Sequence, residues 1–259
     1  MGNLVSEAEM SAYDQDGAVC IRGLFDDEWI ERMREAIERV KNDRTGVPGY
    51  FSDTFLWERD SAFRAFVFDS PAAEIARELM RSRSSRFYFD HLFVKEPGTQ
   101  QPSPWHHDLP FWPVDGDQVC SVWLALDYVT KASSGLEYIA GSHRWGRRFG
   151  PEAFVGTQPM IKGRADDEKI PDIENNRDAY RFLNWDMEPG DCLVHHALTI
   201  HGSGGNTSLE HRRRALATRW VGDDAVYAPD GSSYEPLKDA SLMAGGALES
   251  PKFPLVIAG

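Results

Sequence analysis

From residue 86 onward the chain is dominated by short segments with the two-residue periodicity of β-strands, and this pattern most constrains its fold. Apolar or aromatic side chains alternate in these segments, and turn residues separate them. Strands are expected at residues 86–95, 119–128, 135–139, 182–187, 191–196 and 214–221. Many short strands after a helical N-terminal part favour a β-sandwich or a jelly roll with flanking helices.

The N-terminal part carries helix signals instead. Ser6 with Glu9 three residues later forms a capping-box pattern, and apolar positions at spacings of three and four predict a helix over residues 27–41. Ser70 followed by Pro71 predicts another helix start. We therefore expect a mainly β chain in one domain over residues 1–259, with a helical N-terminal part (1–85), a jelly-roll core (86–222) and a C-terminal tail (223–259) that wraps the body.

Composition excludes several classes of partner. The net charge is -13, from 41 acidic against 28 basic residues. A chain with this acidic excess lacks the basic surface that nucleic-acid binding requires. An anionic membrane surface would repel it. No apolar run reaches the roughly 18 residues that a transmembrane helix needs. We expect a small-molecule substrate, no nucleic-acid partner and no membrane partner, and the sequence leaves the oligomeric state open.

The cysteines indicate a reducing environment. Cys20, Cys120 and Cys192 lie far apart in apolar segments. They match neither a disulfide framework nor a zinc site, so buried reduced thiols are expected. The first residues lack the basic and apolar pattern of a secretory signal. A cytoplasmic location is therefore expected.

The candidate chemistry centres on Trp105-His106-His107-Asp108. Residues i and i+2 of a strand point to the same face, so His106 and Asp108 can reach one metal ion while His107 points away. His201, at the end of a distant apolar run, is the candidate third ligand. Two histidines and one carboxylate with open positions are typical of non-haem Fe(II) oxygenases. A jelly roll would bring these distant segments together at its open end.

Three successive arginines, Arg212, Arg213 and Arg214, follow the candidate third ligand. An arginine that faces inward on this strand could hold a dicarboxylic cosubstrate through a bidentate ion pair, and the others would be solvated. Spacing from His201 favours Arg212. Strand alternation places Arg213 on one face with Ala215, Ala217 and Arg219.

Other segments carry weaker expectations. In an extended strand over 86–95, one face holds Phe87, Phe89, His91, Phe93 and Lys95. In the strand over 119–128, one face holds Ser121, Trp123, Ala125 and Asp127. Residues 143–181 form a long loop, which in a compact domain is usually functional, and we treat it as a candidate lid. Hydrogen-bonded structural roles, rather than metal binding, are expected for His143, His195 and His196.

Taken together, these motifs resemble the phytanoyl-CoA dioxygenase family of Fe(II)/2-oxoglutarate-dependent oxygenases. The resemblance covers nearly the whole chain. It is carried, in order, by Asp16-Gly17-Ala18-Val19, Trp105-His106-His107-Asp108, Trp123, Gly135-Leu136, Gly141-Ser142-His143, Pro189-Gly190-Asp191, His201-Gly202-Ser203-Gly204 and Arg213-Arg214-Ala215-Leu216. The chain departs from the family at His107, where Gln is usual. The family implies a double-stranded β-helix, a cupin-like jelly roll, as the core.

The resemblance also implies roles for individual residues. The iron ligands would be His106, Asp108 and His201. Arg213, the first residue of the family's Arg-Arg/Lys-Ala sequence, would bind 2-oxoglutarate with help from Ser203. Lys95 and Trp123 match family positions near this cosubstrate.

The activity that the resemblance implies is hydroxylation of a C–H bond of a small organic substrate. Fe(II) and dioxygen would act with 2-oxoglutarate, which would leave as succinate and carbon dioxide. Asp108 favours hydroxylation over halogenation, because related halogenases have a small residue there. An acyl-CoA, an amino acid derivative and a secondary metabolite stay open as substrates. The alternatives are a cupin-like metalloenzyme without 2-oxoglutarate and a non-catalytic binding module.

Overall fold

The larger of two main sheets is antiparallel and takes strands from the N-terminal part, the core and the tail. The computed structural model describes residues 2–41, 48–150, 166–229 and 234–259. The strand order is β1 (Ala18–Ile21), β9 (Cys192–His196), β6 (Val119–Ala125), β11 (Arg213–Val221), β3 (Ser85–Lys95) and β13 (Leu255–Ile257), and β2 (Tyr50–Thr54) also pairs with β3. The first and last parts of the chain therefore share a sheet with the core.

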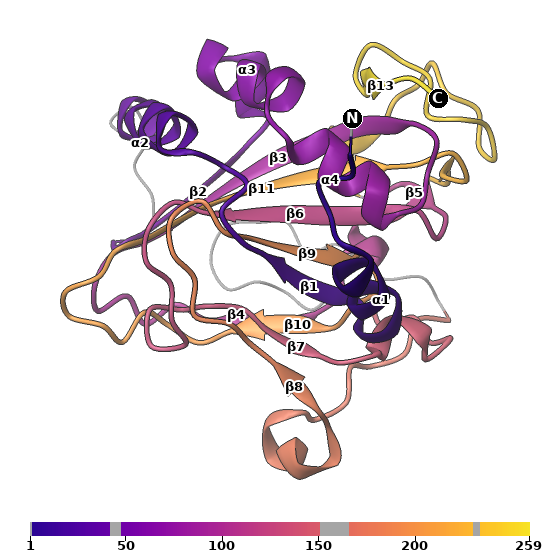
Figure 1. Ribbon diagram of the computed structural model, residues 1–259. Coiled ribbons are helices and arrows are strands. Elements are labelled where there is room, and N and C mark those ends of the chain that lie inside the picture. Colours follow the sequence, from indigo (N-terminus) through magenta and orange to yellow (C-terminus); the bar gives the residue numbers. More distant parts are fainter. Residues whose placement is uncertain (1, 42–47, 151–165, 230–233) are drawn as a thin grey trace.

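A second antiparallel sheet lies below the larger one in Figure 1. Its strands, in spatial order, are β4 (Ser103–His106), β10 (His201–Ser203), β7 (Glu137–Ile139) and β8 (Phe182–Leu183). A separate two-stranded ribbon pairs β5 (Val114–Asp115) with β12 (Val226–Tyr227). This arrangement confirms the mainly β, jelly-roll fold that the strand pattern predicted.

The helices lie outside the two-sheet body. The α-helices are α1 (Glu7–Asp16), α2 (Asp27–Lys41), α3 (Ser61–Asp69) and α4 (Ala72–Leu79). In Figure 1, α2, α3 and α4 lie above the larger sheet, on the side away from the second sheet. The predicted apolar face of α2 buries Ile30, Met33 and Ile37 in one core with the outer face of the larger sheet. These helices therefore cover the outer face of the larger sheet and not the inner face, which is turned toward the second sheet.

Short 3-10 turns and the capping box complete the local structure. The turns are η1 (Leu56–Glu58), η2 (Leu109–Phe111), η3 (Ser142–Arg144), η4 (Glu174–Ala179) and η5 (Glu235–Leu237). At the start of α1 the predicted capping box is formed by Ser6 and Glu9. No helix in the described ranges is long and apolar enough to cross a membrane.

A β-bulge in β3 corrects one expectation. Phe89 pairs with Arg219 but Phe87 pairs with Trp220, so Tyr88 is an extra residue on β3. An extra residue reverses the facing of the side chains beyond it. Phe87 was expected on the face of Phe89, but it packs against Trp220 at 5.3 Å between ring centroids, in the outer core.

Two other expectations differ in extent, and a third is only partly covered by the described residues. β8 spans two residues instead of 182–187. β6 ends at Ala125, and Asp127 does not face inward because its carboxylate binds the backbone N–H of Arg214 at 2.8 Å and its guanidinium at 2.7 Å. Of the candidate lid, residues 151–165 lie outside the described residues.

The turn before β9 gives a test of the fold. Gly190 has φ +94°, and a Cβ there would lie 2.4 Å from the carbonyl oxygen of Phe25. Gly190→Ala should lower the free energy of unfolding by roughly 2–5 kcal/mol, because backbone strain adds to overpacking. Gly23→Ala is the matched control, since Gly23 has φ +61° with nothing within 4 Å of its Cβ position, and it should lose only about 1–2 kcal/mol. Equal losses in chemical denaturation would contradict the clash.

Candidate active site

His106 and His201 face each other across a strand pair. His106 is the last residue of β4, His201 is the first residue of β10, and the two are direct partners in the antiparallel register. Direct partners place their side chains on the same face of a sheet. The centroids of the two imidazole rings are 4.2 Å apart.

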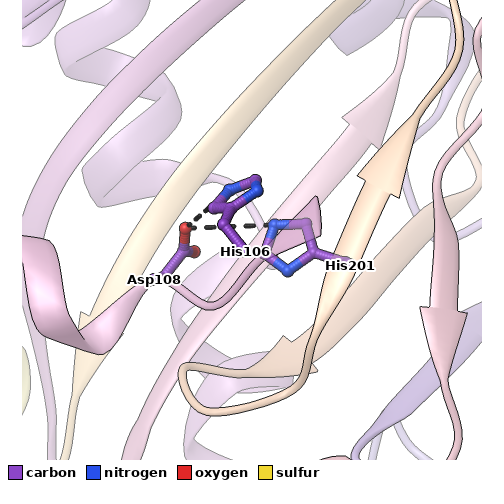
Figure 2. Close-up of side chains that lie close together, drawn as sticks. All are labelled: His106, Asp108 and His201. Atoms are coloured by element: carbon purple, nitrogen blue, oxygen red, sulfur yellow. Dashed lines mark ion pairs between the residues drawn. The ribbon is translucent and has the colours of Figure 1, made fainter. Parts of the chain in front are cut away.

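Asp108 reaches the two histidines from a turn. β4 ends at His106, and Asp108 has helical backbone angles (φ -73°, ψ -41°) at the start of η2. The two side chains meet because the chain turns back here, and strand alternation, which was the expected reason, does not apply. Asp108 Oδ1 lies 3.6 Å from His106 Nε2 and 3.9 Å from His201 Nε2, and Figure 2 shows all three side chains pointing toward one another.

Backbone carbonyls orient both imidazole rings. His106 Nδ1 lies 2.7 Å from the carbonyl oxygen of Pro104, and His201 Nδ1 lies 2.9 Å from that of Thr199. A carbonyl oxygen can only accept, so each neutral ring carries its hydrogen on Nδ1 and presents the Nε2 lone pair to the centre of the cluster. One potential ligand atom from each of the three side chains lies within 4.8 Å of the others. Three converging acceptors of this kind suit a divalent metal ion.

The second carboxylate oxygen of Asp108 is held by the protein. Ser121 Oγ donates to Oδ2 at 3.0 Å, and His195 Nε2 lies 3.3 Å from the same oxygen. Tyr138 Oη lies 3.1 Å from His195 Nδ1. These contacts are all satisfied if Tyr138 donates to Nδ1 and His195 donates from Nε2. Only Oδ1 then faces the two histidines.

His195 is hydrogen-bonded, as was expected of it, and it also lines the pocket beside Asp108. It is the direct cross-strand partner of Ser121. Ser121 was expected on the same strand face as Trp123. Cross-strand partners share a face, so the pairing of His195 with Ser121 also places His195 on the face of Trp123. This position of His195 could not be predicted from the sequence, because the register between β6 and β9 was not known.

Burial and neighbouring groups set the protonation states. Burial alone would raise the pKa of Asp108, but the neighbouring side chains of His106 and His195 hold it well below its usual range. Burial, and then the charge of His106, lower the pKa of His201 well below its usual value. At neutral pH the carboxylate is ionised and His201 is neutral, and these are the forms that bind metal ions.

The remaining histidines near the cluster make structural contacts, as expected. The backbone N–H of Phe149 donates to His107 Nε2 at 2.9 Å, and burial lowers the pKa of His107 to about 4. The rings of His143 and His196 pack at 5.3 Å between centroids. His196 Nε2 also lies 2.8 Å from the carbonyl oxygen of Asp117.

Two buried basic side chains lie side by side where β3 ends and β11 begins. Lys95 and Arg213 are direct partners in the register of β3 and β11, and they are 1% and 2% exposed. Lys95 Nζ donates to Ser134 Oγ at 2.9 Å, to Ser203 Oγ at 3.3 Å and to the carbonyl oxygen of Gly204 at 3.1 Å. Arg213 Nη2 donates to Ser134 Oγ at 3.2 Å.

Arg213 keeps unused hydrogen-bond donors in this buried position. Within the described part of the chain its Nε and Nη1 have no hydrogen-bond partner, and the ring of Trp123 lies 5.6 Å from the guanidinium carbon. Burial lowers the pKa of Arg213 to about 10. Burial, and then the charge of Arg213, lower that of Lys95 to about 6. An unpaired buried cation is costly, so this corner of the pocket suits an anionic ligand.

The two flanking arginines have other partners. Arg212 forms ion pairs with Glu96 at 2.7 Å and Glu38 at 2.8 Å. Arg214 forms an ion pair with Asp127 at 2.7 Å. The pocket is therefore lined by Arg213 and not by Arg212. The flanking pair is ion-paired, where freely solvated side chains were expected.

Ser134 belongs to the same corner and was not anticipated. It accepts from both basic side chains, lies 3.1 Å from Ser203 Oγ, and donates to the carbonyl oxygen of Gly204 at 2.7 Å. Its φ of +69° is in the left-handed region. Such strain, on the order of 1–3 kcal/mol, concentrates at functional sites.

One pocket contains both the histidine–carboxylate cluster and Arg213. Its empty volume, with the open mouth included, is about 1160 Å³. Small-molecule sites are typically lined mainly by apolar and aromatic side chains, with a few polar groups among them. Its aromatic lining comprises Tyr50, Phe89, Phe93, Phe111, Trp112, Trp123 and Tyr234.

The fold and the site define a jelly-roll protein that carries two histidines and a carboxylate, suited to binding a metal ion, in its pocket. The phytanoyl-CoA dioxygenase family (PhyH) matches residues 13–215, and the chain belongs to this family. The family predicted from the sequence motifs is thereby confirmed.

Curated relatives are distant but cover most of the chain. A probable phytanoyl-CoA dioxygenase of Caenorhabditis elegans is 22% identical over 249 residues, which cover 86% of this chain and 77% of the relative. A probable alpha-ketoglutarate-dependent hypophosphite dioxygenase of Stutzerimonas stutzeri is 23% identical over 266 residues, which cover 88% of this chain and 82% of the relative.

Solved structures agree on the fold. The non-heme alpha ketoglutarate dependent carbocyclase SnoK from nogalamycin biosynthesis has a TM-score of 0.77 and 24% identity, over 97% of this chain and 96% of SnoK. The epimerase SnoN in complex with Fe3+, alpha ketoglutarate and nogalamycin RO has a TM-score of 0.73 and 21% identity, over 96% of this chain and 98% of SnoN.

Lys95 should make the stability of the metal-free, unliganded protein depend on pH. Its pKa is about 6 when folded and 10.5 ordinarily, so between these values the unfolded chain binds more protons and stability rises with pH. In urea titrations from pH 6.5 to 8.5, Lys95→Met should be more stable than the wild type. Its advantage should shrink with rising pH by up to about 1.4 kcal/mol per unit. An advantage that is constant with pH would contradict a buried, titrating Lys95.

Proposed function

We propose that the protein is an Fe(II)- and 2-oxoglutarate-dependent dioxygenase that hydroxylates a C–H bond of a small organic substrate and releases succinate and carbon dioxide. The observation that carries this proposal is the presence in one region of three converging acceptor atoms and, beside them, an arginine with unused buried donors. The first feature suits a metal ion and the second suits a dicarboxylic acid. Membership of a dioxygenase family supports the same reaction class.

In this proposal iron is held by Nε2 of His106, Nε2 of His201 and Oδ1 of Asp108. The donor set fits, because two histidines and one carboxylate on one side of the ion leave positions open for other ligands. Fe(II) in such a site supplies activation of dioxygen coupled to decarboxylation of 2-oxoglutarate. Ser121 and His195 engage Asp108 Oδ2, which keeps the carboxylate on one oxygen and preserves the open positions.

Arg213 would bind the distal carboxylate of 2-oxoglutarate. Its Nε and Nη1 have no protein partner among the described residues, and a guanidinium can donate two parallel hydrogen bonds to a carboxylate. Ser203 Oγ and Lys95 Nζ are 3.3 Å apart in the same corner and would assist. The ring of Trp123 covers the guanidinium and helps to exclude water.

Asp108 supports hydroxylation rather than halogenation, because its carboxylate occupies the place that a halide would need. A single domain over residues 1–259 is supported by β2 from the N-terminal part and β13 from the C-terminal tail, which both pair with β3 of the core. A cytoplasmic location is supported by the three cysteines, which are all free.

Spectroscopy and product formation together test the function. Fe(II) and 2-oxoglutarate, added without oxygen, should give a weak visible absorption that neither gives alone. In air, succinate should form slowly, and a true substrate should accelerate its formation. If both signals are absent across a broad panel but metal binds, a cupin-like metalloenzyme without 2-oxoglutarate replaces the proposal. If no metal binds, a non-catalytic module does.

Removing one ligand tests the metal site. His201→Ala should weaken Fe(II) binding by more than about 100-fold, which exceeds the effect of losing a supporting hydrogen bond, and should abolish succinate formation while the fold survives. Metal analysis after reconstitution measures this. His211→Ala, at an exposed histidine, should keep its iron. Full iron occupancy in the His201→Ala protein would show that the ligand assignment is wrong.

Neighbouring arginines test the cosubstrate site. Arg213→Met should cost roughly 2–5 kcal/mol of 2-oxoglutarate binding, because it removes a buried charge pair and leaves the ligand's charge unpaired. Iron should be retained. Arg212→Met, which removes the same charge one residue away, should bind 2-oxoglutarate as the wild type does. Calorimetry under nitrogen measures both, and a loss in Arg212→Met alone would move the site by one residue.

A further inference from the structure

Arg219 is a second buried arginine that the proposed reaction does not use. It lies on β11, on the face that also carries Arg213, and it lines the same pocket. Its cross-strand partners are Phe89 on β3 and Ser121 on β6. Ser121 is the residue that donates to Asp108, so Arg219 lies beside the histidine–carboxylate cluster.

The guanidinium of Arg219 is poorly satisfied by the protein. The residue is 6% exposed. Among the described residues, its guanidinium makes one hydrogen bond, from Nη1 to the carbonyl oxygen of Ala217 at 3.1 Å, and its buried Nε has no partner. It also has no ion pair with any described carboxylate, whereas Arg214 on the same strand pairs with Asp127 at 2.7 Å.

The nearest carboxylates are already engaged. Asp90 accepts the backbone N–H groups of Leu56 at 2.8 Å and Trp57 at 2.7 Å. Asp108 is held on one oxygen by the protein and presents the other to the two histidines. Removing a cation from water costs several kcal/mol unless a partner compensates. The arrangement around Arg219 therefore lacks one partner of negative charge.

Two aromatic rings flank the guanidinium of Arg219 but do not occupy its hydrogen-bond donors. The guanidinium carbon lies 4.9 Å from the centroid of Phe89 and 5.8 Å from that of Trp112. Such contacts stabilise a cation through its face. They leave the N–H groups at its edge for an oxyanion, which a guanidinium binds with two parallel hydrogen bonds.

Arg213 and Arg219 belong to separate binding regions. Six residues of strand separate their Cα atoms by about 20 Å. Arg213 lies with Lys95, Ser134 and Trp123, and Arg219 lies with Phe89 and Trp112. One small dicarboxylic acid on Arg213 would leave Arg219 without its partner.

We propose that Arg219 binds the carboxylate of the substrate, and that the substrate is an organic acid with an aromatic or apolar body that packs against Phe89, Phe111 and Trp112. This inference rests on the proposed function, because it assigns a ligand to the region beside His106, Asp108 and His201 that 2-oxoglutarate on Arg213 would leave open. The carboxylate anchors the substrate beside the proposed iron site and so selects which C–H bond of the substrate faces that site.

Matched acids and amides test the charge requirement. The probes are phenylacetate, 3-phenylpropionate and indole-3-acetate, each compared with its primary amide, which has nearly the same shape and no charge. Calorimetry is done under nitrogen with Fe(II) and saturating 2-oxoglutarate, so that Arg213 is occupied and no turnover occurs. At least one acid should bind the wild type about tenfold or more tightly than its amide.

Variants assign the preference to Arg219. Arg219→Met should abolish it, and the circular dichroism spectrum of this variant should match that of the wild type. Arg219→Lys should retain part of the preference, and Arg212→Met should retain all of it. The inference is overturned if no acid is preferred by the wild type, or if the preference survives Arg219→Met.

Titration of the metal-free protein without 2-oxoglutarate separates this inference from the proposed function. There the acid preference should be kept in Arg213→Met and lost in the double variant Arg213→Met/Arg219→Met, because Arg213 without 2-oxoglutarate can itself bind an acid. A preference of that kind, in a protein that neither binds 2-oxoglutarate nor forms succinate, would support the Arg219 site and reject the dioxygenase. Succinate formation without any acid preference would support the dioxygenase and reject the Arg219 site.

Discussion

The antiparallel pairing of β4 with β10 is the constraint on which the candidate active site depends. It sets His106 directly opposite His201, and a slip of one residue would turn one ring to the other face. β10 also pairs with β7, where Tyr138 is the partner of His201 and contacts His195. The four-stranded sheet thus orients the rings of His106 and His201, and through Tyr138 it also contacts His195, which holds Asp108.

Charge buried on β11 connects the stability of the protein to its ligands. Arg213 and Arg219 occupy the inner face of one strand, and neither has a carboxylate partner within the described residues. Each one costs stability in the unliganded protein, because few protein groups replace its hydration. A ligand that supplies the missing negative charge recovers this cost, and its binding stabilises the folded state by mass action.

The sequence predicted those parts of the site whose chemistry is local. His106 and Asp108 lie two residues apart, and both His201 and Arg213 stand in short recognisable motifs. Ser134 could not be identified in this way, because its role comes from contacts with Lys95 and Arg213 that no local pattern encodes. The hydrogen-bonded role expected for His195 agrees with the structure, but its partners Asp108 and Tyr138 could not be identified from the sequence for the same reason.

By itself, the sequence determined the fold class, the family and the residue types of the candidate site, because strand periodicity and motif spacing are local properties of the chain. Only the tertiary structure decided which side chains meet. The bulge at Tyr88 moved Phe87 out of the pocket, the turn after β4 brought Asp108 to His106, and ion pairs with Glu38 and Glu96 drew Arg212 outward. Register, bulges and ion-pair partners depend on free energies shared between distant strands, and these have no signature within any single segment.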